Sequence, residues 1–224
     1  RAVMPMPRLA FTDNMFGAFN ALRPLGIPRP RSGGVVWDQG MPRAMEVHLD
    51  DGTRYVLTMD YDSLFDPCDV IELTRLMETH PEIDAVAALQ ARRDDDAQLF
   101  QWGGSEGGAR QVTIAREDLA KPTLPVDTAH FGWTMLRTER LRELPKPWFL
   151  AQPDPDGGWD QRRVDADIAF WHGWRAAGFS CHIALRVPVG HMELTVTWPG
   201  PDLRAVRQHI SDYHAVGKPR GIWR

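Results

Sequence analysis

The sequence predicts an α/β fold in which a mixed, mostly parallel central sheet is flanked by helices. Three observations predict this fold. Segments of strand and helix character alternate along most of the chain, an apolar run at 55–59 ends directly in two aspartates, and 224 residues are enough for one sizeable domain. Hydrophobic residues make up 43% and charged residues 25% of the chain, which is ordinary for a globular protein.

The predicted elements follow from periodicity and from helix start and stop signals. Strands are expected at 2–6, 55–59, 85–91, 129–136 and 181–189, and a β-hairpin from 99–102 and 111–115. Helices are expected at 15–22, 37–49, 67–77, 138–144, 164–177 and 201–214. The loop at 145–161 is long and rich in Pro, Gly, Asp and Trp, which favours a lid or an acceptor-binding loop.

No internal repeat or linker divides the chain. We therefore expect one domain at 1–198, with a C-terminal helix and tail at 199–224 packing on it. The net charge of −4 gives no strong nucleic-acid signature. No apolar run approaches the ~20 residues of a membrane span. Cys68 and Cys181 are too few for a disulfide framework, and this cysteine usage predicts a cytoplasmic protein.

The most informative motif is the pair Asp60 and Asp62 at the end of the 55–59 strand. Alternate side chains of a strand share a face, so both carboxylates can point the same way. In open α/β sheets, ligands bind at the carboxyl ends of the strands. Two convergent carboxylates repel each other unless a cation lies between them. The motif therefore predicts a Mn²⁺ or Mg²⁺ site that also holds a phosphorylated ligand.

The motif has three other interpretations. An Asp-rich turn after a strand is common because Asp is a turn-forming residue. A calcium loop of the EF-hand kind fits poorly, because Phe65 stands at its Gly position and Ile71 at its Glu position. A haloacid-dehalogenase-like phosphatase also begins with an apolar strand that runs into Asp-x-Asp.

Further along the chain, polar residues stand at the ends of predicted elements. Asp165 and Asp167 lie at or near the start of the 164–177 helix, where the helix dipole alone favours an acid. His191 follows the 181–189 strand, where a surface or core histidine would be ordinary. Gly132 lies inside the predicted 129–136 strand, and a glycine there often marks a close backbone approach.

The order of these features resembles the GT-A glycosyltransferases, especially the family 2-like members, from about Tyr55 to His191. The resemblance implies a single Rossmann-like domain that moves a sugar from a nucleotide-diphosphate donor, most commonly a UDP- or GDP-sugar, to an acceptor hydroxyl of unknown class. In that family the strand-terminal Asp-x-Asp binds the cation that bridges the donor diphosphate, and a Gly-His after a later strand often completes its coordination.

The resemblance also implies roles for individual residues. It places Asp60, Asp62 and His191 at the metal and Asp167 as the catalytic base of an inverting enzyme. The Glu expected before that base is Ala166 here, which leaves Asp165 as a competing base. Pro5, Arg43, Asp60, Tyr61 and Asp62 are expected on the donor side, although Arg43 fits a solvated helix position equally well. Gly132, Trp133 and Trp159 are expected beside the acceptor.

Two alternatives remain open. The phosphatase family needs its Asp-x-Asp close to the chain start and a later Lys, whereas some fifty residues precede Asp60 and all three lysines lie in Pro-adjacent loops. The second alternative is a domain that binds a nucleotide-sugar or a glycan without turnover, which the Ala166 departure motivates.

Overall fold

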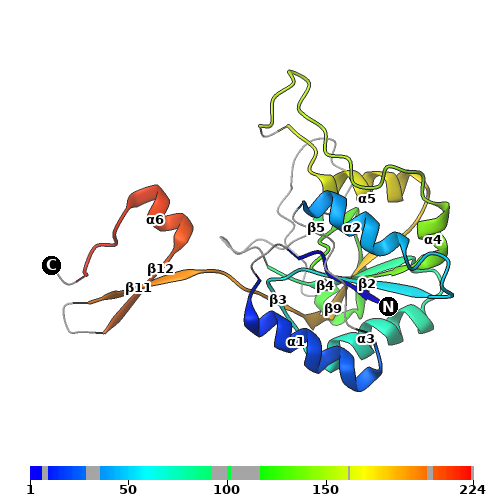
Figure 1. The fold of residues 1–224 in the computed structure, drawn as a ribbon, viewed down its shortest axis with the longest axis horizontal. Helices are drawn as coiled ribbons and strands as arrows, with labels where there is room; N and C mark the ends of the chain where they lie inside the picture. Colours follow the sequence, from blue (N-terminus) through cyan, green and yellow to red (C-terminus); the bar gives the residue numbers. More distant parts are fainter. Residues whose placement is uncertain are drawn as a thin grey trace.

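The computed structural model describes residues 1–6, 10–28, 36–91, 100–101, 117–160, 162–200 and 204–222. Its centre is a six-stranded sheet in the order β1-β2-β8-β4-β9-β6 (Figure 1). The strands are β1 (Ala2–Val3), β2 (Tyr55–Met59), β8 (Trp133–Arg137), β4 (Ala85–Leu89), β9 (Cys181–Pro188) and β6 (Thr123–Pro125). Strands β1, β2, β4 and β9 run in one direction, and β8 and β6 run in the other. The predicted α/β class with a mixed, mostly parallel sheet is therefore confirmed.

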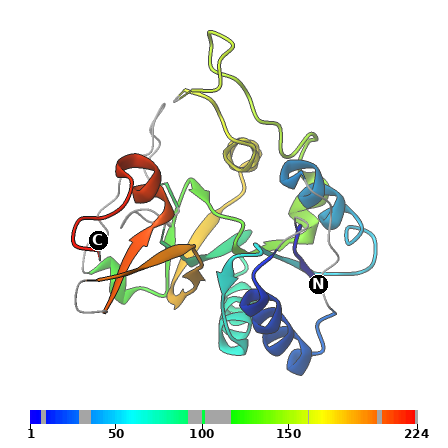
Figure 2. The ribbon, with the colours of Figure 1, turned by 60° about the vertical axis from the view of Figure 1, so that its left-hand side comes forward.

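Helices cover both faces of the sheet (Figures 1 and 2). On one face lie α2 (Trp37–Glu46), α4 (Thr138–Glu143) and α5 (Ala166–Ala176), and on the other lie α1 (Thr12–Leu22) and α3 (Pro67–Thr79). Neighbouring strand residues supply the two cores, because alternate side chains point to opposite faces. Val56 packs with the first group of helices and Leu57 with the second.

Helix α3 begins as its sequence predicts. The Asp66 side chain accepts a hydrogen bond from the Cys68 N–H at 2.6 Å, and Asp69 accepts one from the Asp66 N–H at 2.8 Å, which forms a capping box. Pro67 occupies the first helical position, where its missing N–H costs nothing. This firm start places the turn between β2 and α3 at the carboxyl edge of the sheet.

The structure differs from the strand predicted at 129–136 and from the predicted β-hairpin before it. The strand expected at 129–136 divides into β7 (Thr128–Ala129) and β8, with a turn at 130–132 between them. Strand β5 (Phe100–Gln101) pairs antiparallel with β7. The hairpin partner expected at 111–115 lies outside the described residues. Two short 3₁₀ turns, Arg23–Leu25 and Asp118–Ala120, complete this part of the chain.

The prediction of a helix at 201–214 is wrong. Strand β11 (Thr195–Pro199) pairs antiparallel with β12 (Ala205–His209), and helix α6 covers only Ile210–Val216. Val206 and Gln208 point inward while their neighbours are exposed, which is the period of two of a strand. The apolar residues of this segment also fit a helical spacing, and the prediction followed that spacing. The predicted boundary after residue 198 falls inside β11. Figure 1 shows the hairpin and α6 extending away from the sheet instead of covering it, and the division into domains stays a prediction.

Among the described residues, no helix has both the length and the apolar character that crossing a bilayer requires.

Candidate functional site

Asp60 and Asp62 lie in a tight turn directly after β2. The Asp60 N–H donates to the Gly132 carbonyl at 3.2 Å, and the Ser63 N–H donates to the Asp60 carbonyl at 3.4 Å. Asp62 is buried, with 4% of its surface exposed. Because β2, β4 and β9 run in the same direction, this turn shares its edge of the sheet with the residues that follow β4 and β9.

Asn14 of α1 fixes the shape of this turn. Its Nδ2 donates to the Asp60 carbonyl at 2.9 Å and to the Ser63 carbonyl at 2.6 Å. The side chain is fully buried. The N-cap position of α1 is Phe11, and no side chain caps the helix. The buried amide instead holds both ends of the two-aspartate turn.

A short strand pair brings His191 beside Asp62. Strand β3 (Ser63–Leu64) pairs antiparallel with β10 (Gly190–His191), with His191 opposite Ser63. The His191 Nε2 lies 3.6 Å from the Asp62 Oδ2, and the Met192 N–H donates to the Asp62 carbonyl at 2.7 Å. The sequence separation is large, so this pairing is what makes Asp62 and His191 neighbours.

The ring orientation of His191 bears on what it can bind. Its Nδ1 lies 3.0 Å from the Ala91 carbonyl, which can only accept, so Nδ1 carries the proton. In the neutral ring, Nε2 is then an acceptor that faces the carboxylate of Asp62. Two acceptors face each other favourably only when a proton or a cation lies between them. Histidines that bind metals commonly hold their other ring nitrogen in this way.

Gln90 and His130 buttress the same turn from β4 and from the 130–132 turn. The Gln90 Nε2 lies 3.2 Å from both the Ser63 Oγ and the Gly190 carbonyl, and thus joins β3 to β10. The His130 Nε2 donates to the Ala88 carbonyl at 2.8 Å, and its Nδ1 accepts from the Gly132 N–H at 3.0 Å. Burial lowers the pKa of His130 to about 4, so its ring stays neutral at neutral pH.

The chain approaches Gly132 too closely for any side chain at that position. A Cβ there would lie 2.8 Å from the Gln90 Oε1 and 2.9 Å from both the His130 Nδ1 and the Ser63 Oγ. The glycine therefore marks a close approach, as its position in the sequence suggested. The groups that approach are side chains of this chain. The close approach at Gly132 therefore does not indicate that an acceptor substrate contacts this residue.

Trp37, at the start of α2, is a direct partner of the first aspartate. Its indole N–H donates to the Asp60 Oδ1 at 3.1 Å. Its ring packs edge-on against Phe131 and Phe149, with centroids 5.7 and 5.3 Å away. The packing of its ring holds the Trp37 N–H donor and the apolar indole against Asp60.

Burial raises the pKa of the Asp60 carboxyl to about 6. The Trp37 hydrogen bond opposes this rise, and the negative charge of Asp62 adds to it. Smaller effects come from His191, which lowers the pKa, and from Asp167, which raises it. The predicted residues Asp62, Asp167 and His191, from three separate stretches of sequence, therefore act electrostatically on one carboxyl group.

The two acids at the start of α5 lie in different environments. Asp165 is exposed, and its carboxylate pairs with the Arg163 guanidinium at 2.8 Å. Asp167 is half-buried and accepts from the Ile168 N–H at 2.9 Å. Burial raises the pKa of Asp167, and the Asp165 charge adds to the rise. Asp165 occupies the N-cap position but makes no side-chain cap hydrogen bond.

The residues expected on the donor side are dispersed. Pro5 is buried just beyond β1. Tyr61 is half-buried in the turn itself, and its ring stacks with Phe11 at a centroid distance of 6.4 Å. Arg43 is exposed on α2, and its Nε donates to the Gln39 carbonyl of the same helix at 2.8 Å. This contact fits the solvated helix position that the sequence also allowed.

The two tryptophans expected at the acceptor differ sharply. Trp133 has no exposed surface and stacks on Phe65 at a centroid distance of 3.7 Å. A side chain so placed belongs to the core and offers an acceptor no surface, contrary to the role expected for Trp133. Trp159 is 62% exposed. It lies in the connection between α4 and α5, which rises away from the sheet in both views (Figures 1 and 2). Its predicted role stays a prediction.

The residues at this edge can hold only part of a metal's coordination shell. Within the described ranges, no three His, Cys, Asp or Glu side chains converge closely enough to hold an ion by themselves. Mg²⁺ is commonly bound through one or two carboxylates together with substrate phosphates, without an all-protein cage. The donor set of one carboxylate oxygen beside one imidazole nitrogen, with Asp60 nearby, fits a Mn²⁺ or Mg²⁺ ion completed by a diphosphate.

Sequence reasoning missed Asn14, Trp37, Gln90 and His130 at this site. A tryptophan that starts a helix after a Pro/Gly-rich stretch of sequence was a usable signal for Trp37. Gln90 stands directly after the β4 strand, at the edge where the aspartates were expected. Nothing in the sequence distinguished Asn14 from an ordinary capping residue.

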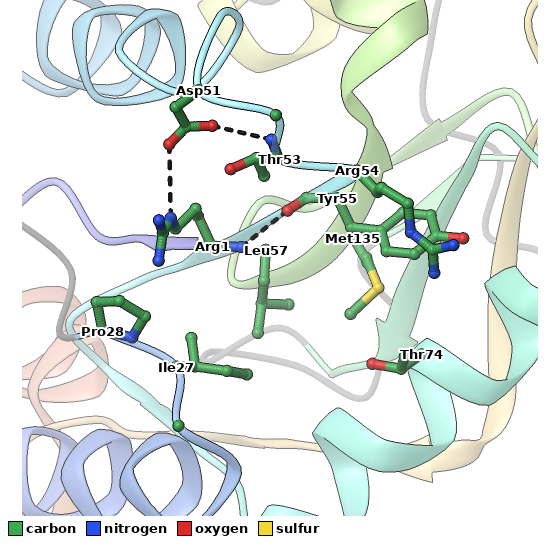
Figure 3. Close-up of a pocket in the computed structure, with 12 residues that line it drawn as sticks. Arg1, Ile27, Pro28, Asp51, Thr53, Arg54, Tyr55, Leu57, Thr74 and Met135 are labelled. Carbon is green, nitrogen blue, oxygen red and sulfur yellow. Dashed lines mark hydrogen bonds and ion pairs between the residues drawn. The ribbon is translucent and has the colours of Figure 1, made fainter.

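A separate pocket of about 400 Å³ lies at the opposite edge of the sheet, around Tyr55 at the start of β2 (Figure 3). Leu57, Met135 and Ile27 form its apolar part, and Arg1 and Asp51 form an ion pair at its rim. Because β2 runs from this pocket to Asp60, the pocket does not belong to the site of the two aspartates.

Comparison with known proteins shows similarity at the level of fold. No family model and no curated protein matches the sequence. Among solved structures, A197 from STIV aligns with a TM-score of 0.56 at 12% identity, over 93% of this chain and 94% of that one. The mannosyltransferase PcManGT from Pyrobaculum calidifontis, solved with GDP-Man and Mn²⁺, aligns with a TM-score of 0.43 at 12% identity, over 85% of this chain and 55% of that one.

Proposed function

We propose that this protein is a metal-dependent glycosyltransferase that moves a sugar from a nucleoside-diphosphate donor to an acceptor hydroxyl. The observation that carries the proposal is the pairing of β3 with β10, which sets the His191 Nε2 3.6 Å from the Asp62 Oδ2. Asp60 and Asp167 lie within electrostatic reach of each other at the same place. The order of these residues in the sequence, which resembles family 2-like GT-A enzymes, supports the same conclusion.

Asp62 and His191 would hold the ion, with Asp60 on its donor side. A bound Mn²⁺ or Mg²⁺ supplies positive charge that stabilises a departing nucleoside diphosphate. Trp37 orients the Asp60 carboxylate through its indole N–H. Asn14 and Gln90 keep the turn and the His191 strand at a fixed separation through four hydrogen bonds.

Asp167 is the proposed base that takes a proton from the acceptor hydroxyl. Its partial burial and raised pKa make it a better proton acceptor than an exposed carboxylate would be. Asp165 is the weaker candidate, since its carboxylate is exposed and neutralised by Arg163. Inversion of the anomeric configuration follows from direct displacement with a single base of this kind, and this outcome is part of the proposal.

The phosphatase alternative requires a lysine near the aspartates. Lys121 pairs with Asp118, Lys146 pairs with Glu46, and Lys218 lies over the Trp198 ring, 5.7 Å from its centroid. These are the three lysines of the sequence. The aspartates also follow the second strand of the sheet, behind β1, α1 and α2. Both observations favour sugar transfer over phosphate hydrolysis.

A thermal-shift screen tests the proposal directly. The protein is heated with UDP, GDP, CDP and dTDP sugars, each with and without Mn²⁺, and we expect one nucleotide to raise the melting temperature only when the metal is present. Asp62→Asn is the matched variant, since it keeps the shape of the side chain and removes the charge. The proposal fails if no nucleotide shifts the melting temperature with metal. Binding without transfer or donor hydrolysis would favour the non-catalytic alternative.

A further inference from the structure

The hairpin β11–β12 and helix α6, at 195–222, form a C-terminal arm that is incomplete as a folded unit. The principal contacts of these three elements are with one another. An isolated two-stranded hairpin is marginally stable in water, and a helix of seven residues is too short to be stable alone. Figure 1 shows the C-terminal arm extended away from the sheet. Its stability therefore depends on surface that the rest of this copy does not supply in this arrangement.

The interior of the C-terminal arm is small. Trp198 donates from its indole N–H to the Gln208 Oε1 at 3.0 Å, and its ring lies 5.9 Å from that of Tyr213. Gln208 in turn donates to the Gly217 carbonyl at 2.8 Å. No residue of α6 is buried. These contacts fix the shape of the C-terminal arm but leave Ile210, Tyr213 and Val216 exposed.

Two surfaces of the C-terminal arm are open. Along α6, Ile210, Tyr213 and Val216 follow one another at a spacing of three and are 37%, 38% and 76% exposed. Residues three apart share a helix face, so these three form one apolar stripe. On the hairpin, Thr197 and Arg207 are directly opposite each other on the exposed face. A partner thus meets an apolar stripe beside a hairpin face that carries Arg207.

Charge indicates which partner fits. Residues 195–224 contain five Lys or Arg and two Asp or Glu, a net charge of +3. The whole chain carries −4, so residues 1–194 carry −7. A basic arm on an acidic domain is electrostatically complementary to the domain of another copy, and complementary charge steers and orients association.

We propose that the C-terminal arm docks on the domain of a second copy of this chain, giving a dimer in which each copy receives the arm of the other. Such an exchange is closed and two-fold symmetric, so it stops at the dimer. The C-terminal arm begins four residues after His191, whose strand is tied to the Asp62 turn. The proposal concerns assembly and stands whether or not the site transfers a sugar.

Sedimentation velocity of the full chain over a dilution series, at low and at high salt, tests this proposal. We expect a dimer that dissociates on dilution and weakens as salt is added. Arg207→Glu and Val216→Asp should each weaken the dimer by at least ~10-fold, because one reverses a charge and the other places a charge in the apolar stripe. Both positions are exposed and lie outside the domain at 1–194, so both variants should keep the secondary structure of that domain in circular dichroism.

Val47→Asp is the matched control. Val47 is 66% exposed on the domain, against 76% for Val216, and the two substitutions add the same charge. The control should leave the dimer unchanged. A chain that stays monomeric at every concentration overturns the proposal, and so does a dimer that neither salt nor the two arm variants weaken. A monomer whose arm binds anionic lipid vesicles or RNA would also overturn it, because the partner would then not be a second copy.

Discussion

Asp60→Asn should make the stability of the protein depend differently on pH. The folded chain raises the pKa of this carboxyl from 3.8 to about 6, mainly through burial. Between these two values, the folded state binds the proton more tightly than the unfolded state does. The free energy of unfolding therefore falls as the pH rises through this window, and the destabilisation is complete above about pH 6. An asparagine side chain cannot ionise, so the variant lacks this loss.

The magnitude follows from the two pKa values. A rise from 3.8 to about 6 corresponds to ~3 kcal/mol when fully expressed. Asp60 retains some contact with solvent, which reduces the effect, so we expect about 1–2 kcal/mol. Asparagine keeps the Oδ1 acceptor for the Trp37 indole, so this hydrogen bond is preserved. The variant should then gain stability relative to the parent as the pH rises from about 4 to about 7.

Urea unfolding followed by tryptophan fluorescence, without metal, at a series of pH values measures the difference between the two proteins. His130 titrates in the same window with the opposite sign, but it is present in both proteins and cancels. Asp51→Asn is a control of opposite sign, since the Thr53 and His48 hydrogen bonds lower the pKa of Asp51. That variant should lose stability relative to the parent as the pH rises toward 3.8, the ordinary pKa of an aspartate, and the difference should stay constant above it. Parallel stability curves for Asp60→Asn and the parent would refute the reasoning.

Three further predictions concern the roles of individual side chains. Asp62→Ala should abolish metal-dependent donor binding in calorimetry with Mn²⁺, and His191→Ala should weaken it less, because a carboxylate contributes charge as well as a ligand atom. Asp167→Asn should retain donor binding but lose transfer by at least ~10²-fold in a donor-release assay. Asp165→Asn should keep nearly the activity of the parent, because the Asp165 carboxylate pairs with Arg163 and makes no cap hydrogen bond. The reverse result would move the base to Asp165. Asn14→Leu should cost ~2 kcal/mol in chemical unfolding, because one buried and one partly buried carbonyl lose their donor, and unchanged stability would contradict the role of Asn14 in holding the turn at 60–63.

The fold was predictable where the sequence pattern had one interpretation. The apolar run that leads into Asp60 is short and is followed by a strong helix start at Asp66. The strand and the helix start were both predicted at the positions where the structure has them. The C-terminal segment has two interpretations, because its apolar residues fit both a period of two and a helical spacing. Pairing of β12 with β11 decided between them, and pairing partners cannot be seen from one segment alone.

The candidate site divides in a similar way. The aspartates, His191 and the acids of α5 could be singled out from sequence because each stands at the boundary of an element, where a polar residue interrupts an apolar pattern; their roles stay predictions. Trp133 was misjudged because a tryptophan next to a glycine resembles a binding residue, whereas its neighbours on β8 place it in the core. A period-two pattern assigns faces along a strand, but it does not reveal which face a helix covers.

The residues that the sequence could not supply are those that join separate segments. Asn14 connects α1 to the turn at 60–63. Gln90 connects that turn to Gly190, which follows Gln90 by 100 residues in the sequence. Each is an uncharged amide whose effect depends on what it faces after folding. Two amides with four hydrogen bonds hold the Asp62 carboxylate near the His191 ring, although both groups can accept and would otherwise separate. The polar groups proposed to bind an ion can thus be located from sequence, but the groups that hold them together require the fold.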